Sequence, residues 1–244
     1  MDYIILFFIG ILATTIGTLA GGGGLISLPS MLVLGIPVHS AIAANKVSNT
    51  ISSFSSFFHL YREKKITFKE SFWVIPVSLM GGVSGGFIAS KISSDDMYIV
   101  AISLLIFAFF ASFLGKGNLS GDQPLKPSGK SVPGLYAIGI YDGLFGPGQG
   151  TLMLYLFGSL NIAYIRAVGY VRLATFSSCL GAAITYISTG AVIWPLTLAL
   201  MAGSVTGAQI GVRIASKLNP RYVKPILRVM TLALVLQIFL EKAV

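Results

Sequence analysis

The sequence is poor in charged residues, cysteine and histidine, and each shortage argues against a class of protein. Charged residues make up 10% of the 244 residues, against about 25% in a typical soluble domain. So little charge cannot cover a water-facing surface, which argues against a soluble enzyme or a nucleic-acid-binding domain. The single cysteine, Cys179, excludes an internal disulfide and a four-cysteine zinc site. We therefore expect a protein that is not an enzyme and that holds no cofactor and no metal.

Apolar residues are abundant instead. They account for 55% of the chain, and the mean hydropathy is +0.84. At about 20 apolar residues per helical crossing, the length allows roughly six to nine crossings. The formal net charge of +9 reflects cations in short loops, as the positive-inside rule predicts, so we expect no nucleic-acid partner. The composition predicts an all-α polytopic membrane protein embedded in a lipid bilayer.

The chain divides into two apolar halves joined by a polar linker. The apolar segments of the first half lie at about 3–20, 25–35, 38–61, 71–91 and 97–114. Segment 25–35 is too short to cross a bilayer. The linker is rich in Gly, Pro and Ser and contains three lysines. We therefore predict a first transmembrane repeat at 1–114, a cytoplasmic linker at 115–131 and a second transmembrane repeat at 132–244.

The second half repeats the first at a constant offset of 126 residues. Gly24 aligns with Gly150, and the run Ile88–Lys91 aligns with Ile214–Lys217, both reading Ile-Ala-Ser-Lys. A shared composition would give scattered glycine and alanine matches rather than a gapless match of four residues. We therefore infer an internal repeat.

The positions of the basic loops predict that the two repeats are inverted. In the first half the basic loop, 62–69, follows the third segment, whereas the corresponding region of the second half, 188–194, carries no charge. There the cations Arg213 and Lys217 come one crossing later. If basic loops face the cytoplasm, the halves point in opposite directions, each with one broken or re-entrant helix pair and three full transmembrane helices. A parallel arrangement stays open if the first segment crosses fully.

Two glycine-rich runs interrupt the apolar sequence, one in each half. They are Gly21, Gly22, Gly23 and Gly24 in the first half and Gly146, Pro147, Gly148, Gln149 and Gly150 in the second. In lipid, a broken backbone is tolerated only inside protein or beside a water-filled cavity. A helix that restarts after a break presents free N–H groups and a positive dipole end, which suit an anion. We predict two buried breaks that form part of an anion site, with close helix packing as the alternative.

Three charged residues lie within apolar sequence. Lys46 and Arg172 are repeat mates, and intramembrane cations usually face a cavity or a partner. We predict that Lys46, and Arg172 beside it, bind the anion, with snorkelling of Lys46 to the interface or a structural pair as alternatives. Asp142 has no acidic mate in the first half. It is predicted either to couple transport to protons or to pair with one of the two cations.

Polar side chains near the same level would orient the bound anion. These are Asn45, Ser48, Asn49, Gln149 and Thr175. A further fragment, Gly82–Gly85, has the shape of the serine motif of intramembrane proteases and would need a histidine near Ser84. Because glycines at this spacing also pack helices against one another, we expect a packing role there.

The motifs quoted above resemble those of the TauE/SafE family, the sulfite exporters and related anion permeases. Ala20–Leu25, followed by Pro29 and Ala43–Lys46, is similar to the first-repeat signature of that family. Tyr141–Gly148 is similar to the second-repeat signature of its YfcA-like branch. The resemblance covers nearly the whole chain.

Two positions depart from the family pattern. Gln149 interrupts the second glycine run, and Val171 stands where the first repeat has Asn45. The two half-sites are therefore expected to differ.

The resemblance implies membrane transport of anions, especially sulfur oxyanions and organosulfonates. It leaves the individual anion, the direction, the coupling ion and the oligomeric state open. A channel or carrier for another small solute, such as a carboxylate, is the alternative function. We expect a multi-pass protein of a prokaryotic cytoplasmic (inner) membrane, a secondary permease for a small anion such as sulfite. Alternating access would operate at a midplane site between the two broken helices.

Overall fold

A computed structural model describes residues 2–21, 23–93, 96–97, 99–100, 103 and 119–218. Gly22 and most of the predicted segment 97–114 lie outside these residues. Regular secondary structure in the described residues is entirely helical, as the composition predicts. The helices are α1 (Asp2–Ala20), α2 (Gly24–Val33), α3 (Val38–Arg62), α4 (Phe68–Ser71), α5 (Val74–Ala89), α7 (Ser131–Leu144), α8 (Gln149–Ser159), α9 (Tyr164–Ser188) and α10 (Trp194–Ala215).

Helix lengths follow the apolar segments with one difference. Within the described residues, α1, α9 and α10 are long and apolar enough to cross a membrane. At 1.5 Å per residue, α2 spans only about 15 Å, half of a bilayer core. The predicted segment 71–91 is shorter in the structure, because its helix begins at Val74. Pro76 has no N–H to donate to the carbonyl of Phe72, which favours a helix that begins within the turn before the proline.

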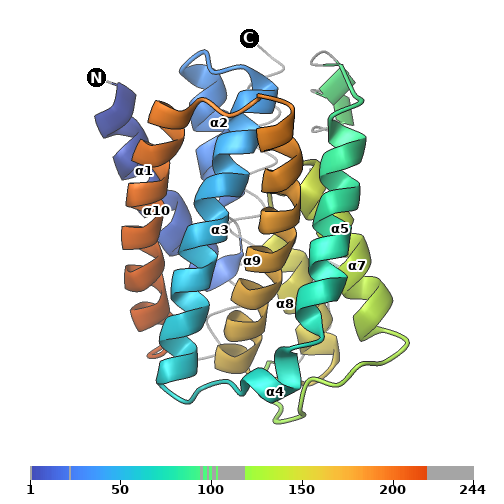
Figure 1. Ribbon diagram of the computed structural model, residues 1–244. Helices are drawn as coiled ribbons and strands as arrows, with labels where there is room; N and C mark the ends of the chain where they lie inside the picture. Colours follow the sequence, from blue (N-terminus) through green and yellow to red (C-terminus); the bar gives the residue numbers. More distant parts are fainter. Residues whose placement is uncertain are drawn as a thin grey trace.

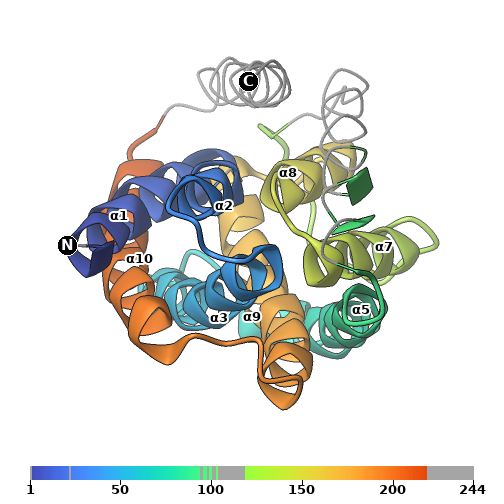
Figure 2. The same ribbon diagram turned by 90° about the horizontal axis from the view of Figure 1, so that it is seen from above.

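The helices form two layers (Figure 2). One layer contains α10, α3, α9 and α5, and the other contains α1, α2, α8 and α7. Between the layers, α1 packs on α10 and α7 packs on α5. The two broken pairs, α1–α2 and α7–α8, therefore lie side by side in one layer and are backed by the long helices of the other.

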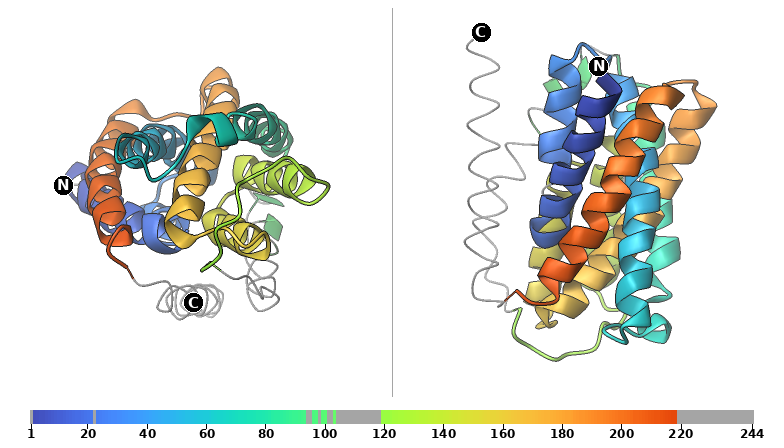
Figure 3. Two further views of the ribbon diagram at one scale, coloured as in Figure 1. Left: turned by 90° about the horizontal axis from the view of Figure 1, so that it is seen from below. Right: turned by 90° about the vertical axis from the view of Figure 1, so that its left-hand side faces the viewer.

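Helices α3 and α9 run in opposite directions, and so do α1 and α7 (Figure 1). Helix α3 runs from the top of the view to the bottom and α9 from the bottom to the top. Helix α1 begins at the top, whereas α7 begins at the bottom. Helix α4 and the segment 119–130 lie at the bottom end (Figure 3). The basic loop, the described part of the linker and the end of α10 therefore share one end of the bundle.

Glycines allow the two layers to approach closely. A Cβ atom on Gly85 of α5 would lie 2.1 Å from the carbonyl oxygen of Ile140 in α7. A Cβ atom on Gly207 of α10 would lie 2.3 Å from the carbonyl oxygen of Ile11 in α1. No side chain fits at either position, so these glycines have the packing role expected of small residues at membrane helix interfaces.

Candidate functional site

The two helix breaks meet inside the bundle. Gly21 ends α1 with a φ of +75°, and a Cβ atom there would lie 2.1 Å from the carbonyl carbon of Gly150. The hydroxyl of Thr151 in α8 donates a hydrogen bond of 2.7 Å to the carbonyl oxygen of Ala20. The end of α1 and the start of α8 are thus tied together, and only glycine satisfies both the backbone conformation and the contact at residue 21.

A small cavity lies between the breaks. Its volume is about 30 Å³, above the roughly 10–15 Å³ that a water molecule needs. Most of its wall consists of residues predicted for the site, which are Gly21, Gly23, Gly24, Asn45, Asn49, Asp142, Gly146, Gln149, Arg172 and Thr175; Thr14 and Gly17 of α1 complete it. The lining is polar and comes from both halves of the chain.

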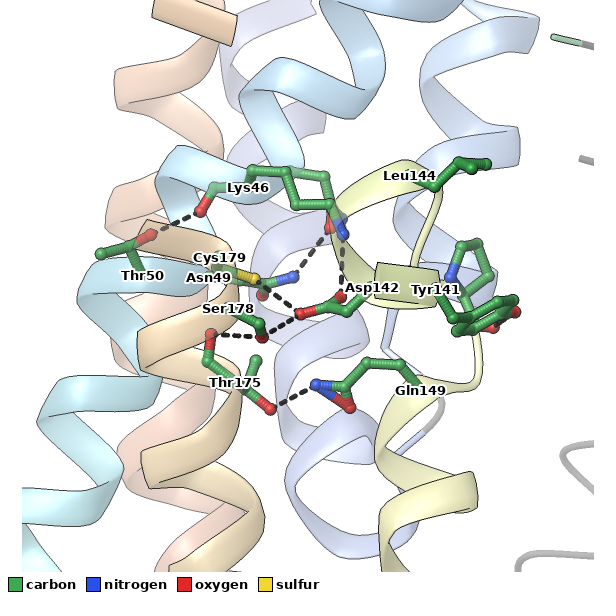
Figure 4. A network of polar contacts seen from close by, with 12 residues as sticks. Lys46, Asn49, Thr50, Tyr141, Asp142, Leu144, Gln149, Thr175, Ser178 and Cys179 are labelled. Carbon is green, nitrogen blue, oxygen red and sulfur yellow. Dashed lines mark hydrogen bonds and ion pairs between the residues drawn. The ribbon is translucent and has the colours of Figure 1, made fainter. Parts of the chain in front are cut away.

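Lys46 and Asp142 form a buried ion pair beside the cavity (Figure 4). The Lys46 Nζ and Asp142 Oδ1 atoms are 2.8 Å apart, and both side chains are almost completely buried. The second oxygen, Oδ2, accepts hydrogen bonds from the hydroxyl of Ser178 and, at 3.4 Å, from the thiol of Cys179. Gly146 leaves room for the pair, since a Cβ atom there would lie 2.2 Å from Lys46 Nζ. Of the two cations considered from the sequence, Lys46 is the partner of Asp142.

Arg172 is a buried cation that has no carboxylate partner among the described residues. Its side chain borders the cavity, and the residue is 5% exposed. One guanidinium nitrogen donates a 2.6 Å hydrogen bond to the carbonyl oxygen of Gly17, while Nε has no hydrogen-bond partner among the described residues. No described carboxylate lies within 4.0 Å of the guanidinium. Because burying an uncompensated charge is expensive, this guanidinium is suited to an anion.

Side-chain amides from both halves complete the wall. Asn45 donates through Nδ2 to the hydroxyl of Ser27 at 2.6 Å, and Asn49 donates to Asn45 Oδ1 at 2.8 Å. Gln149 donates through Nε2 to the hydroxyl of Thr175 at 2.6 Å (Figure 4). These bonds hold the amides in place before any ligand binds.

The family model described as sulfite exporter TauE/SafE matches residues 6–238. This chain belongs to the TauE/SafE family. Membership agrees with the resemblance of its two break motifs and makes it a multi-pass membrane protein of a transporter family.

Relatives of this TauE/SafE protein are named as probable membrane transporters. One from Sinorhizobium sp., the probable membrane transporter protein ORF9, is 29% identical over 97% of this chain and 92% of the relative. A probable membrane transporter protein from Haemophilus influenzae is 27% identical over 93% and 90%. The probable membrane transporter protein YfcA of Escherichia coli K12 is 27% identical over 91% and 84%. No solved structure matches the chain.

Some predicted residues of this TauE/SafE protein lie outside the cavity wall. The hydroxyl of Ser48 is hydrogen-bonded to that of Ser204 in α10 at 2.8 Å. The carbonyl oxygen of Pro147 accepts a hydrogen bond from the Tyr141 hydroxyl, and Gly148 caps α8. Gly150 contacts Gly21, and Gly22 is outside the described residues.

The neighbour of Ser84, in the protease-like fragment, is a tyrosine and not the histidine that serine-protease chemistry requires. The Ser84 hydroxyl lies 3.2 Å from the hydroxyl of Tyr136. Gly82, in the same fragment, packs against the backbone of Ser178, since a Cβ atom there would lie 1.9 Å from the Ser178 carbonyl oxygen. These contacts fit the packing interpretation of the fragment.

Two partners of Asp142 were not predicted from the sequence. Ser178 and Cys179 lie on α9, three and four residues after Thr175. Such spacings place side chains on one side of a helix. This periodicity is the signal that would have added Ser178 and Cys179 to the predicted site.

Proposed function

We propose that this TauE/SafE protein is a secondary permease for a small anion, a sulfur oxyanion or an organosulfonate such as sulfite. Arg172 is the observation that carries the proposal. Its buried guanidinium borders the cavity between two helix breaks and has no carboxylate partner among the described residues. A bound anion supplies the missing negative charge.

The charge balance of the cavity favours a single negative charge. Lys46 and Asp142 compensate each other at 2.8 Å, so Arg172 leaves one positive charge. Hydrogen sulfite and alkylsulfonates each carry one negative charge, which would neutralise the site. The starts of α2 and α8 add the positive ends of two helix dipoles. This balance gives Arg172 the direct role in binding.

In this proposal, the role of Lys46 depends on whether Asp142 is ionised. While Asp142 is ionised, the ammonium group is bound to it. If Asp142 takes up a proton, Lys46 becomes free to face the cavity, and a second negative charge can be compensated. This exchange would couple a proton to a doubly charged anion, with Asp142 as the coupling residue.

The proposal includes two inverted repeats, 1–114 and 132–244, around the linker 115–131. Shifting the bounds of α3 by 126 residues gives the bounds of α9, Tyr164–Ser188. The same shift places α1 over α7, at 128–146 against Ser131–Leu144, and α5 over the later part of α10, at 200–215 within Trp194–Ala215. The packing of α1 on α10 and of α7 on α5, together with the opposite directions of α3 and α9 (Figure 1), supports the inversion.

Alternating access would move bodies that contain parts of both repeats. Because α1 packs on α10 and α7 on α5, the first body contains α1, α2 and α10, and the second contains α5, α7 and α8. The pair α3 and α9, which pack on each other, lies between these bodies. Rocking of one body against the other would expose the cavity alternately at the two ends.

The end that carries the basic loop 62–69 and the linker is proposed to face the cytoplasm. The α1 start would then face the opposite side of a prokaryotic inner membrane. Most basic residues of the described helices and loops gather at that one end, including Arg62, Lys64, Lys65, Lys69, Lys126, Lys130, Arg213 and Lys217.

Thermal unfolding of the purified protein with and without anions tests the proposal. The ligands are sulfite, thiosulfate, sulfate, small sulfonates and small carboxylates, each at fixed pH. A sulfur anion at 100 times its Kd should stabilise the wild type by about 2.7 kcal/mol. Arg172→Gln should lose this stabilisation, because it removes the uncompensated charge.

Arg166→Gln is the matched control. Arg166 lies on the same helix, but its guanidinium is paired with Glu70 at 2.8 Å and with Asp122 at 3.1 Å, away from the cavity. The control should keep the anion response. An Arg172→Gln protein that is folded and still stabilised like the wild type would refute the proposed site. Stabilisation by carboxylates alone would favour the carboxylate carrier, and flux without counterflow would favour a channel.

A further inference from the structure

Helix α3 has a polar face that leads away from the central cavity. Asn45 and Asn49 border the cavity, and Ser52, Ser56 and His59 follow at steps of three or four residues, which keeps them on one side of the helix. From Asn49 to His59 this face extends about 15 Å along the axis. The opposite side is apolar and exposed, and it carries Ile51, Phe54 and Tyr61.

This face makes α3 unusually polar for its length. Helices α3 and α9 both contain 25 residues. Among the described helices, α9 has the hydropathy of a membrane span, and α3 does not. A helix of this length inside a membrane tolerates such a face only where it meets protein or water.

Two serines of α3 have hydroxyl groups that form no hydrogen bond with the described residues. Ser53 and Ser56 are fully buried, and their hydroxyls have no hydrogen-bond partner among the described residues. Buried serines of α9 behave differently, since Ser177 and Ser178 donate to carbonyl oxygens four residues earlier. A buried polar group without a partner indicates a place that water reaches, so the interior beside Ser56 is expected to be hydrated during part of the transport cycle.

A second cavity lies at the far end of this face. Its volume is about 400 Å³. Its lining consists of Ser55, Phe58, His59, Arg62 and Glu63, from the end of α3, and Gln209 of α10. Glu63 Oε1 lies 3.2 Å from His59 Nε2. The cavity lies at the end of α3 that leads into the basic loop, where anions are attracted. Hydrogen bonds tie α3 to α10 from Ser48 to Ser204, and from Gln209 to Ser55 in the wall of the larger cavity.

We propose that the polar face of α3 is one wall of the aqueous route by which the anion moves between the central cavity and the cytoplasmic end. The larger cavity is the mouth of this route, and Arg62 receives the anion there. The route opens when α10 separates from α3 and the bonds of Ser48 and Ser55 break. This inference rests on the proposed function, since it assigns a path to the same anion.

Cysteine modification tests the route in membrane vesicles. Ser56→Cys places a thiol on the polar face, and Phe54→Cys is the matched control on the exposed apolar face at a similar depth. The reagents are two water-soluble methanethiosulfonates of similar size, one with an anionic sulfonate and one with a cationic trimethylammonium group. The native Cys179 gives a background that is measured on the wild type. Arg62→Cys, at the mouth of the route, gives the reaction rate of a fully accessible thiol.

Ser56→Cys should react several-fold faster than Phe54→Cys. The rate of Ser56→Cys with the anionic reagent, divided by its rate with the cationic reagent, should exceed the same ratio for Arg62→Cys. Ser53→Cys replaces Ser56→Cys if the latter does not fold. Reaction no faster than at Phe54→Cys overturns the route. If wild-type protein still binds the anion in that case, the proposed function survives and only the path is wrong. A preference for the cationic reagent overturns an anion route and, with no Arg172-dependent binding, the proposed function as well.

Discussion

Asp142→Asn should destabilise the protein strongly, because it leaves the ammonium group of Lys46 buried without its counter-charge. The two groups are 2.8 Å apart and almost completely buried. With an effective dielectric constant of about 20, Coulomb's law gives an attraction of about 6 kcal/mol at this distance. Removing one partner of a buried pair typically costs about 3–5 kcal/mol. For a chain of this size, that cost lowers the melting temperature by roughly 6–20 °C.

The double variant Lys46→Met/Asp142→Asn tests whether the charge pair is the cause. Removing both charges leaves no unpaired ion, and the amide oxygen introduced by Asp142→Asn would still accept a hydrogen bond from Ser178. The double variant should therefore recover most of the lost stability. Thermal unfolding of the wild type, both single variants and the double variant in one detergent gives the coupling free energy directly. A double variant as unstable as Asp142→Asn, with a coupling near zero, would refute the reasoning.

Gly21→Ala should unfold at a much lower temperature than Gly35→Ala. Both glycines have a φ of +75°. A Cβ atom on Gly21 would lie 2.1 Å from the backbone of Gly150, whereas a Cβ atom on Gly35 would have nothing within 4 Å. Gly35→Ala should lose only the roughly 1–2 kcal/mol of the left-handed conformation, and equal melting temperatures would argue against contact between the breaks. In proteoliposomes, Asp142→Asn should lose the acceleration of anion flux by a pH gradient, because an amide cannot take up the transported proton. Acceleration equal to that of the wild type would exclude Asp142 as the coupling residue.

The helix boundaries could be predicted from the sequence because they depend on local features. Apolar length, glycine runs and prolines fix where a chain in lipid starts and ends a helix. The predicted segments 3–20 and 38–61 differ from α1 and α3 by one residue at an end. The start of α5 was misjudged because the apolar character continues through Phe72 and Trp73, while the backbone restriction comes from Pro76.

The residues that line the central cavity were predicted better than the way in which they pair. The offset of 126 residues predicted Lys46 and Arg172 as equivalent cations, but it could not predict which of the two forms the ion pair with Asp142. That choice depends on side-chain direction and on the space left by Gly146, which are properties of the packed bundle. The sequence also gives no measure of the close approach of Gly21 to Gly150, which brings the two breaks to one cavity.

The packing of α1 on α10 has a consequence for how the protein is made. Thr15 of α1 donates a hydrogen bond to the carbonyl oxygen of Gly207, 192 positions further along the chain. At about 5–20 residues per second, a ribosome needs roughly 10–40 s to make that stretch. Helix α7, in contrast, emerges when its partner α5 is already in the membrane. Helix α1 must therefore wait for α10, and its glycine-lined contact surface is covered by lipid or by the insertion machinery until α10 arrives.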